Sequence, residues 1–87
     1  KLQNYRGPAR FVCMIVFTRQ HRTKRGDLMM FVEVADDSAH FDVVVMPNLY
    51  ERTKDILKKG AVILVEGKID REESCLAKSI QPVEMPQ

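Results

Sequence analysis

The sequence predicts an all-β domain with a single helix placed between its third and fourth strands. Three observations predict it: five short runs rich in β-branched and aromatic residues, one stretch of helical periodicity, and polar connections between them. With 87 residues, the chain is long enough for one domain with a modest core. Its 45% apolar and 30% charged residues are typical of a globular domain.

The first predicted strand follows a polar leading segment. Gly7-Pro8 punctuates residues 1–10, which we expect to lie outside the domain. Residues 11–18 are β-branched, aromatic and without Gly or Pro, so they predict a strand. Apolar residues occupy both faces of this run, which indicates a strand covered on both sides.

The second predicted strand spans residues 28–35. Alternation places Met29, Phe31 and Glu33 on one face of it. Because Glu33 should be solvated, we expect Met29 and Phe31 to share the outer, wetter face with it.

The third predicted strand spans residues 40–46 and follows a short polar turn. Asp42 marks its outer face by the same reasoning, and Val44 lies on that face two residues later. Short connections between the three strands predict an antiparallel meander.

The predicted helix begins after Pro47. Asn48 is its expected N-cap, and Glu51 stands three residues later, close to a capping box. Tyr50 is expected to anchor the helix to the barrel. Lys58-Lys59-Gly60 predicts the end of the helix, with cations at its negative end and Gly just beyond.

Two further strands are predicted at residues 61–70 and 75–80, joined by a polar hairpin turn. Gly67 inside the first of them indicates a bulge or a barrel corner. The domain is therefore predicted to span residues 11–81, followed by a linker at 82–87. The order β-β-β-α-β-β is the layout of the OB-fold, a five-stranded Greek-key barrel with one helix.

Positive charge is concentrated in residues 19–27, predicted to connect the first two strands. This segment holds Arg19, Arg22, Lys24 and Arg25 against the single acid Asp27, whereas the net charge of the whole chain is only +2. A cationic connection between strands suits a phosphate backbone. The alternative is a solvated loop that keeps the chain soluble.

Several classes of protein are not supported. Cys13 and Cys75 lie in separate apolar runs without a CxxC motif, and His21 and His40 are not at ligand spacing, so we expect no metal site and no cofactor. Two isolated thiols fit a reducing compartment.

No catalytic constellation or phosphate loop is evident, so this fragment is not expected to be an enzyme. No apolar run approaches the ~18 residues of a membrane span, and the polar opening residues 1–6 predict no signal peptide. Because the initiator Met is missing, we expect a domain excised from a longer protein, or one whose upstream residues were removed.

A family resemblance rests on several motifs in consistent order. Residues 23–31 resemble the T-K-K/R-G-x-x-M-A/M-F signature of the OB domain in the alpha subunit of bacterial DNA polymerase III. Residues 42–50 resemble its E-V-V-L/V-F-P-x-x-Y element, and residues 57–60 and 64–69 resemble its L-x-x-G and V-x-G-x-I/V elements. Cys13, Ala35, Ala39 and Met46 depart from the pattern. They indicate a divergent member, as in some Gram-positive alpha-type polymerases, or a related OB-fold of the tRNA-anticodon-binding superfamily.

The resemblance implies a non-catalytic module of a cytoplasmic bacterial replicative polymerase that contacts single-stranded template DNA. The catalytic carboxylates would lie outside this chain. Its partners would be the template, other polymerase domains and replisome subunits, without a membrane or a small-molecule substrate. OB-folds bind single strands across strands 2 and 3 and the loops beside them. The candidate contacts are Arg19, Arg22, Lys24, Arg25, Met29, Phe31, Val44 and Arg71, with His21 a weaker contributor.

Some of these candidates have alternative interpretations. Phe31 is the best stacking residue, unless the sheet twists enough to cover it. Arg71 lies in a turn with Asp70, Glu72 and Glu73, so that turn is net acidic and should add little phosphate affinity. Phe11, Phe17 and Phe41 are expected in the core or against a partner domain.

The alternative function is a protein-docking module with little DNA contact. The acidic turn and the apolar residues expected on the surface, Met29, Val44 and Met46, support it.

Overall fold

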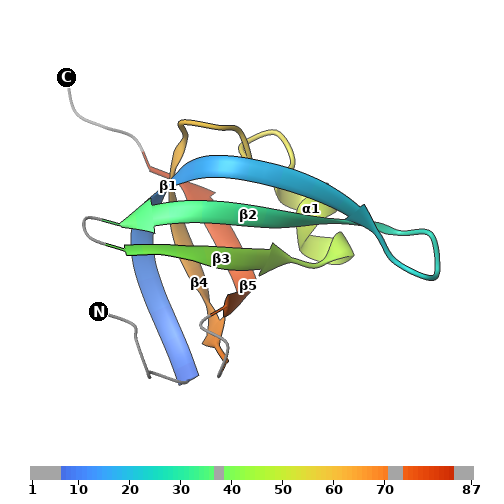
Figure 1. The fold of residues 1–87 in the computed structure, drawn as a ribbon, viewed down its shortest axis with the longest axis horizontal. Coiled ribbons are helices and arrows are strands. Elements are labelled where there is room, and N and C mark those ends of the chain that lie inside the picture. The colour runs from blue at the N-terminus through green and yellow to red at the C-terminus, as the bar shows by residue number, and fades with distance from the viewer. Residues whose placement is uncertain (1–6, 37–38, 71–73, 84–87) are drawn as a thin grey trace.

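The computed structural model describes residues 7–36, 39–70 and 74–83 as one closed barrel (Figure 1). Its strands pair in the order β1-β2-β3-β5-β4. The elements are β1 (Gly7–Arg22), β2 (Leu28–Asp36), β3 (Ala39–Val45), α1 (Pro47–Thr53), β4 (Val62–Ile69) and β5 (Ser74–Pro82). The predicted order of five strands with a helix between the third and fourth is therefore confirmed.

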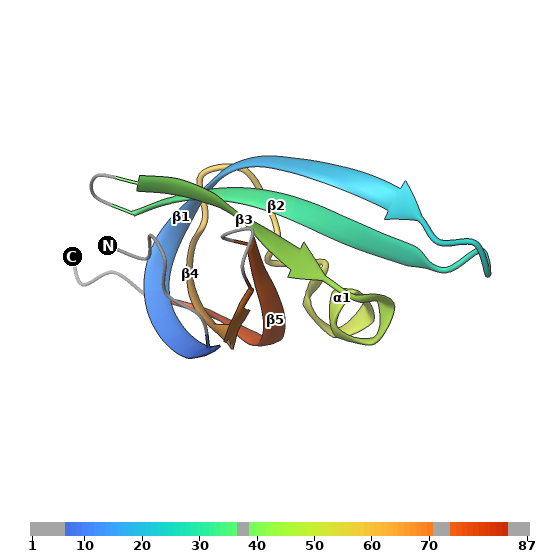
Figure 2. The ribbon, with the colours of Figure 1, turned by 60° about the horizontal axis from the view of Figure 1, so that its bottom comes forward.

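β1 is much longer than the eight residues predicted for it. Residues 7–10, expected in the leading segment, pair with the end of β4, and Gly7 lies opposite Ile69. Residues 19–22, expected in a loop, pair with β2 as far as Arg22 opposite Leu28. Figures 1 and 2 show how β1 bends, so that its first half runs along β4 and its second half along β2. Four residues of the predicted cationic loop are thus part of the sheet.

A β-bulge in β1 changes which side chains face outward. The register with β2 shifts between Ile15, which lies opposite Val34, and Phe17, which lies opposite Glu33. Without the extra residue, strict alternation would place Phe17 on the same inner side as Ile15. Instead Phe17 is 55% exposed. The prediction that both faces of this strand are covered is wrong here, and Phe17 is not a core residue.

The core lies inside the barrel and is closed at one end by α1. Valine and isoleucine side chains from every strand fill it, and Leu49, Tyr50 and Leu57 cover the end. The predicted inward alternation of β2 and β3 is confirmed, since Val32, Val34, Val43 and Val45 are almost fully buried. Phe11 and Phe41 pack edge to face, with ring centroids 4.9 Å apart, against this core.

The helix begins and ends earlier than predicted. Met46 is its N-cap and makes no side-chain capping hydrogen bond. Pro47 lies in the first turn of the helix, where a backbone N–H would have no partner within the helix, so its absence is tolerated. The predicted N-cap at Asn48 is therefore wrong, and the helix ends at Thr53 rather than near Lys59. The Thr53 hydroxyl donates to the Leu49 carbonyl oxygen at 2.8 Å. Among the described residues, no helix is long and apolar enough to cross a membrane.

Tyr50 anchors the helix as predicted. Its side chain is buried, and its hydroxyl accepts a hydrogen bond of 2.8 Å from Nε2 of Gln20 on β1. Gly60 adds a second tie, because its N–H donates to the carbonyl oxygen of Ile15 at 2.7 Å, beside the bulge. Both contacts hold the second half of β1 in place over the barrel end.

The bulge predicted at Gly67 is present, but its extra residue is Lys78 on the facing strand β5, since Glu66 pairs with Ser79 and Gly67 pairs with Ala77. The register between β4 and β5 shifts between Glu66 and Gly67. A Cβ atom at Gly67 would overlap the backbone of β5, at the Leu76 carbonyl oxygen and 2.9 Å from the Ala77 Cα. The absence of a side chain therefore lets the two strands approach closely enough to close the barrel.

Both cysteines are buried strand residues, and the pKa of Cys75 leads to a testable prediction. Burial, with a smaller contribution from the charge of Asp70, raises the pKa of the Cys75 thiol from 9.0 to about 11. Below pH 9 the thiol is protonated in both folded and unfolded chains. Above it, the unfolded chain loses the proton first, so stability falls as the pH rises towards 11.

We expect the free energy of unfolding to fall between pH 9 and 11 by about 2 kcal/mol more in the wild type than in Cys75→Ala. Urea unfolding at a series of pH values measures this difference. Parallel pH profiles for the two proteins would contradict the assignment, because all other titrating groups are shared.

Candidate nucleic-acid interface

The outer face of β1, β2 and β3 carries an aromatic and cationic row of side chains. Strand pairing places Arg19 opposite Phe31, and Phe31 opposite Val44. We call these three residues the Phe31 row. The pairing of Val44 with Leu76, which is 48% exposed, continues the row onto β5. The Phe31 row therefore crosses three strands, and Leu76 extends this outer face onto a fourth.

Phe31 occupies the predicted outer face and is flanked by two basic side chains. The Arg19 guanidinium carbon lies 5.1 Å from the ring centroid, within the range of a cation–π interaction. The His21 ring centroid lies 5.7 Å away, at a tilt of 59°. Phe31 is half-buried, and its ring lines an open hollow on this face. An aromatic ring beside a guanidinium group and a second ring, on an open sheet, suits stacking with a nucleobase.

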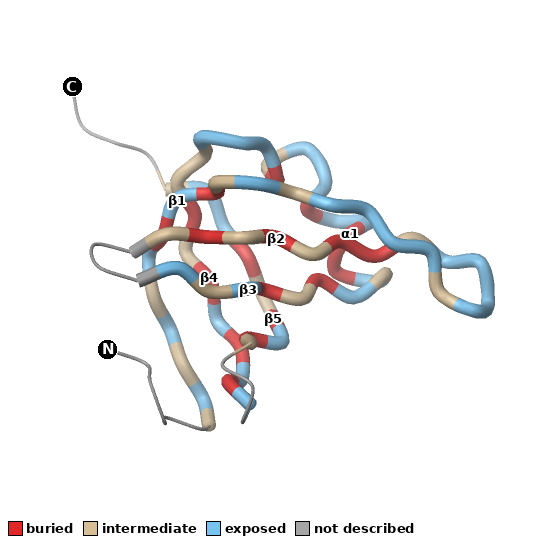
Figure 3. Tube along the Cα trace, in the orientation of Figure 1, coloured by how far each residue is buried: buried red, intermediate tan, exposed pale blue. Residues whose placement is uncertain are grey.

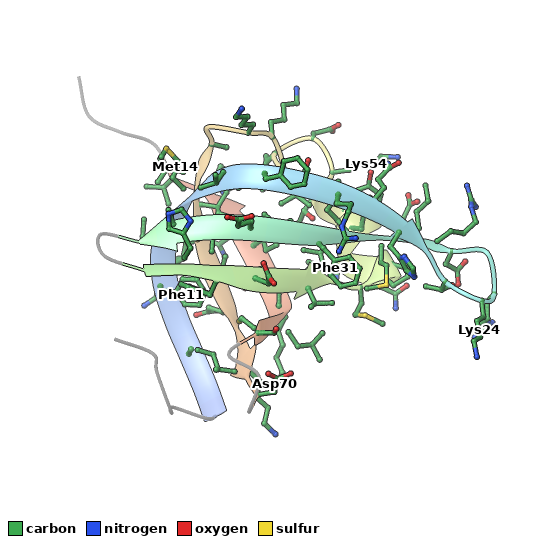
Figure 4. The ribbon with its side chains drawn as sticks, in the orientation of Figure 1. Phe11, Met14, Lys24, Phe31, Lys54 and Asp70 are labelled. Atoms are coloured by element: carbon green, nitrogen blue, oxygen red, sulfur yellow. The ribbon has the colours of Figure 1, made fainter. Side chains whose placement is uncertain are left out.

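The β1–β2 hairpin tip is short and well bonded. The Thr23 N–H donates to the Asp27 carbonyl oxygen at 2.8 Å, and the Gly26 N–H donates to the Thr23 carbonyl oxygen at 2.9 Å. Gly26 has a φ of 94°, a backbone conformation that favours glycine. Lys24 and Arg25 are exposed at this tip, which extends beyond the barrel (Figures 3 and 4). Their charged groups are therefore accessible to an anionic ligand.

Arg22 has a different role from its two neighbours at the tip. Its Nη1 donates a hydrogen bond of 2.7 Å to the Gly26 carbonyl oxygen. This bond spans the turn and braces it. Arg22 therefore adds positive charge to the hairpin while its guanidinium shapes the tip.

One predicted site residue is buried, and another lies outside the described residues. Met29 is only 8% exposed, so the prediction that it lies on the exposed outer face is wrong. Its side chain is buried although it is not part of the core cluster. Both sides of β2 are thus covered at this end, since Met30 fills the core. Arg71 lies outside the described residues.

An open hollow of about 580 Å³ lies between the hairpin tip and the start of α1. Lys24 and Arg25 line one side of it, and Met46, Pro47 and Asn48 line the other. Met46 is 44% exposed, as predicted. The hollow reaches from the basic hairpin tip to the start of the helix, and it is open enough for a nucleic-acid strand to lie in it.

Sequence reasoning missed two residues of the outer face, Phe17 and Leu76. The bulge that turns Phe17 outward has no marker in the sequence, such as Gly or Pro. The outward orientation of Leu76 was predictable from strand alternation, because its neighbours Cys75 and Ala77 both point into the core. Its apolar character gave no reason to single it out.

Comparison with known proteins places the chain in a family. Residues 12–83 match the tRNA anti-codon family model, described as an OB-fold nucleic acid binding domain. A mitochondrial single-stranded DNA binding protein from S. cerevisiae superposes with a TM-score of 0.70 over 91% of this chain and 96% of that one. The two are 15% identical, so this likeness concerns the fold alone.

The relatives by sequence include bacterial DNA polymerases. DNA polymerase III subunit alpha from Halalkalibacterium halodurans is 39% identical over 70% of this chain, and that from Staphylococcus aureus is 29% identical over 84%. An error-prone DNA polymerase from Anaeromyxobacter dehalogenans is 27% identical over 76%. The chain covers only 6% to 7% of the length of these relatives. The resemblance to polymerase III alpha subunits is confirmed. With its closed five-stranded barrel and the helix between β3 and β4, the chain belongs to the OB-fold nucleic acid binding domain family.

Proposed function

We propose that the chain is a single-stranded-DNA-binding module of a bacterial replicative DNA polymerase, in contact with the template strand. The observation that carries this proposal is the Phe31 row on the outer face, continuous with the basic hairpin tip. The polymerase relatives support the context. The catalytic residues of such a polymerase would lie outside this chain, in a protein of the bacterial cytoplasm, and its other domains and replisome subunits would be the remaining partners.

The row and the tip would act on different parts of the ligand. A base stacked on an aromatic side chain contributes about 1–3 kcal/mol, and Phe31 offers such a ring. Lys24 and Arg25 at the tip would neutralise phosphates, and Arg19, the β1 member of the row, would add a third positive charge. This division lets bases stack on the sheet while the backbone follows the hairpin.

The isolated domain is expected to bind modestly. The net charge of the chain is only +2, and the outer face also carries Glu33 and Asp42, which repel phosphates. If three or four phosphates are neutralised, log K should fall with log salt at a slope of roughly −2 to −3.

Reversing the charge of the hairpin tip is expected to weaken binding and flatten its salt dependence. In Lys24→Glu/Arg25→Glu, two phosphate contacts become repulsive, so the slope should fall by about one unit or more. Fluorescence anisotropy with labelled oligo(dT) at two salt concentrations measures both effects. Lys58→Glu/Lys59→Glu, in the segment that follows the C-terminal end of α1, makes the same change in net charge and should bind almost as the wild type does.

Two results would contradict the proposal. One is the absence of salt-sensitive binding up to high micromolar protein. The other is equal loss of affinity in both double variants, which would indicate a net-charge effect without a site. Unlabelled RNA and duplex DNA competitors should displace the oligonucleotide less effectively than single-stranded DNA does.

A second candidate function is docking on another polymerase domain. Val12 and Met14 on β1 are 49% and 46% exposed, and their strand partners Leu64 and Val62 are half-buried beside them. Figure 4 shows Met14 away from Phe31. If this patch docks, Val12→Ser/Met14→Ser should reduce binding to the neighbouring polymerase domain in pull-downs while leaving oligo(dT) affinity unchanged. Unchanged pull-downs would exclude the patch.

A further inference from the structure

A small hollow of about 160 Å³ lies on the outer face beside the Phe31 row. Its lining comes from three neighbouring strands: Phe17 and Arg19 from β1, Phe31 and Glu33 from β2, and Asp42 from β3. Sites that enclose a drug-sized ligand span ~300–1,000 Å³. This hollow is smaller, and its scale suits the insertion of a single planar ring.

Two aromatic rings and a guanidinium group form one part of the hollow. Phe17 is turned outward by the bulge and is 55% exposed, and Phe31 lies under the Arg19 guanidinium at 5.1 Å. Flat apolar and cationic surfaces of this kind stack on any nucleobase and do not distinguish one from another. Selectivity must therefore come from the other residues.

Two carboxylates form the remaining part. Glu33 and Asp42 are direct partners across β2 and β3, so their side chains project from the same face with Cβ atoms ~5 Å apart. Like charges placed directly opposite destabilise a sheet. Glu33 has one partner, His40 Nδ1 at 3.3 Å, whereas Asp42 has no hydrogen-bond or ion-pair partner within the described ranges. An unfavourable pair of this kind is typical of a functional site.

The chemistry of the two carboxylates selects among bases. A carboxylate only accepts hydrogen bonds, so it favours a base edge that presents N–H groups. Guanine presents the adjacent N1–H and N2–H2 donors, and its O6 accepts from a guanidinium such as that of Arg19. Thymine presents one N–H between two carbonyl oxygens, which the carboxylates repel. Phosphates are repelled as well, so a base rather than the backbone should enter.

From this arrangement we propose that the hollow is a base subsite that prefers guanine over thymine within a bound single strand. The inference rests on the proposed function, because the strand must first reach this face. Phe17 and Phe31 would hold the base, Glu33 and Asp42 would accept from its Watson–Crick edge, and Arg19 would donate to O6.

The test compares oligonucleotides of identical length and charge. Labelled (dT) of about nine nucleotides and the same strand with one central guanine are titrated by anisotropy at one salt concentration. The guanine strand is expected to bind at least about fivefold more tightly, the lower end of what a bidentate base contact gives. Replacing that guanine with inosine, which lacks the N2 amino group, should remove most of the gain.

Variants separate base reading from general electrostatics. Glu33→Ala and Asp42→Ala should both raise affinity for the thymidine strand, since repulsion is removed, while the guanine-to-thymine affinity ratio falls towards one. Asp55→Ala, on the helix side, should leave the ratio unchanged. Equal binding of guanine, inosine and thymine strands by the wild type would overturn the inference alone. Failure of every strand to bind would instead overturn the proposed function on which it depends.

Discussion

Replacing Phe31 with alanine is expected to weaken binding to oligo(dT) by about tenfold or more, because a base stacked on an aromatic ring contributes about 1–3 kcal/mol. The loss should also release Arg19, whose guanidinium lies over the ring at 5.1 Å. The fold should persist, since Phe31 is only half-buried and is not part of the core cluster. Anisotropy titrations and a thermal melt of the same sample measure both quantities.

Two variants serve as controls for this prediction. Phe31→Trp keeps an aromatic ring, so its affinity for oligo(dT) should be close to that of the wild type and higher than that of Phe31→Ala. Met14→Ala removes an exposed apolar side chain from β1 on another part of the surface, where it is 46% exposed, and should leave affinity unchanged. If Phe31→Ala and Met14→Ala bind alike, the ring is not a stacking platform.

The largest loss of stability is expected for Gly67→Ala. A Cβ atom at this position would overlap the Leu76 carbonyl oxygen and approach the Ala77 Cα to 2.9 Å, and backbone cannot rotate away as a side chain can. Overpacking of this kind costs about 1–3 kcal/mol or more. In a domain of this size, each kcal/mol lowers the melting temperature by about 4–8 °C. We therefore expect Tm to fall by about 10 °C or more, or the protein to be recovered unfolded.

Gly26→Ala provides a graded comparison. Its Cβ would meet nothing within 4 Å, but φ is 94°, so only the conformational penalty of ~1 kcal/mol applies. Circular dichroism melts of both variants should rank Gly67→Ala as clearly less stable. Equal melting temperatures would show that β4 and β5 can separate at the bulge without cost.

The pattern of side chains predicted the barrel and which side chains of β2 and β3 face outward. Alternation alone placed Phe31 and Glu33 on the outer face of β2, because a strand with one buried side has a period of two. The same argument placed Asp42 and Val44 on β3. These predictions succeeded because both strands pair regularly over that length.

Regularity failed where the backbone departs from the ideal strand. The bulge after Ile15 turns Phe17 outward, and no residue type marks it. The charge of residues 19–22 suggested a loop, yet Gln20 bonds to Tyr50 and Arg19 covers Phe31, so tertiary contacts keep this segment in the sheet. The capping preference of Asn predicted the N-cap at Asn48, whereas the helix already begins at Pro47 and Met46 is its N-cap.

The most direct test of the single-strand interface is chemical-shift mapping by NMR with unlabelled oligo(dT). Binding across the outer face predicts that amide shifts concentrate on Phe17, Arg19, Phe31 and Val44 and on the hairpin tip, and that they shrink as salt is raised. The amides of Val12, Met14 and Leu64 should stay unchanged. Shifts confined to that second set, or none at high micromolar protein, would contradict binding through the Phe31 row.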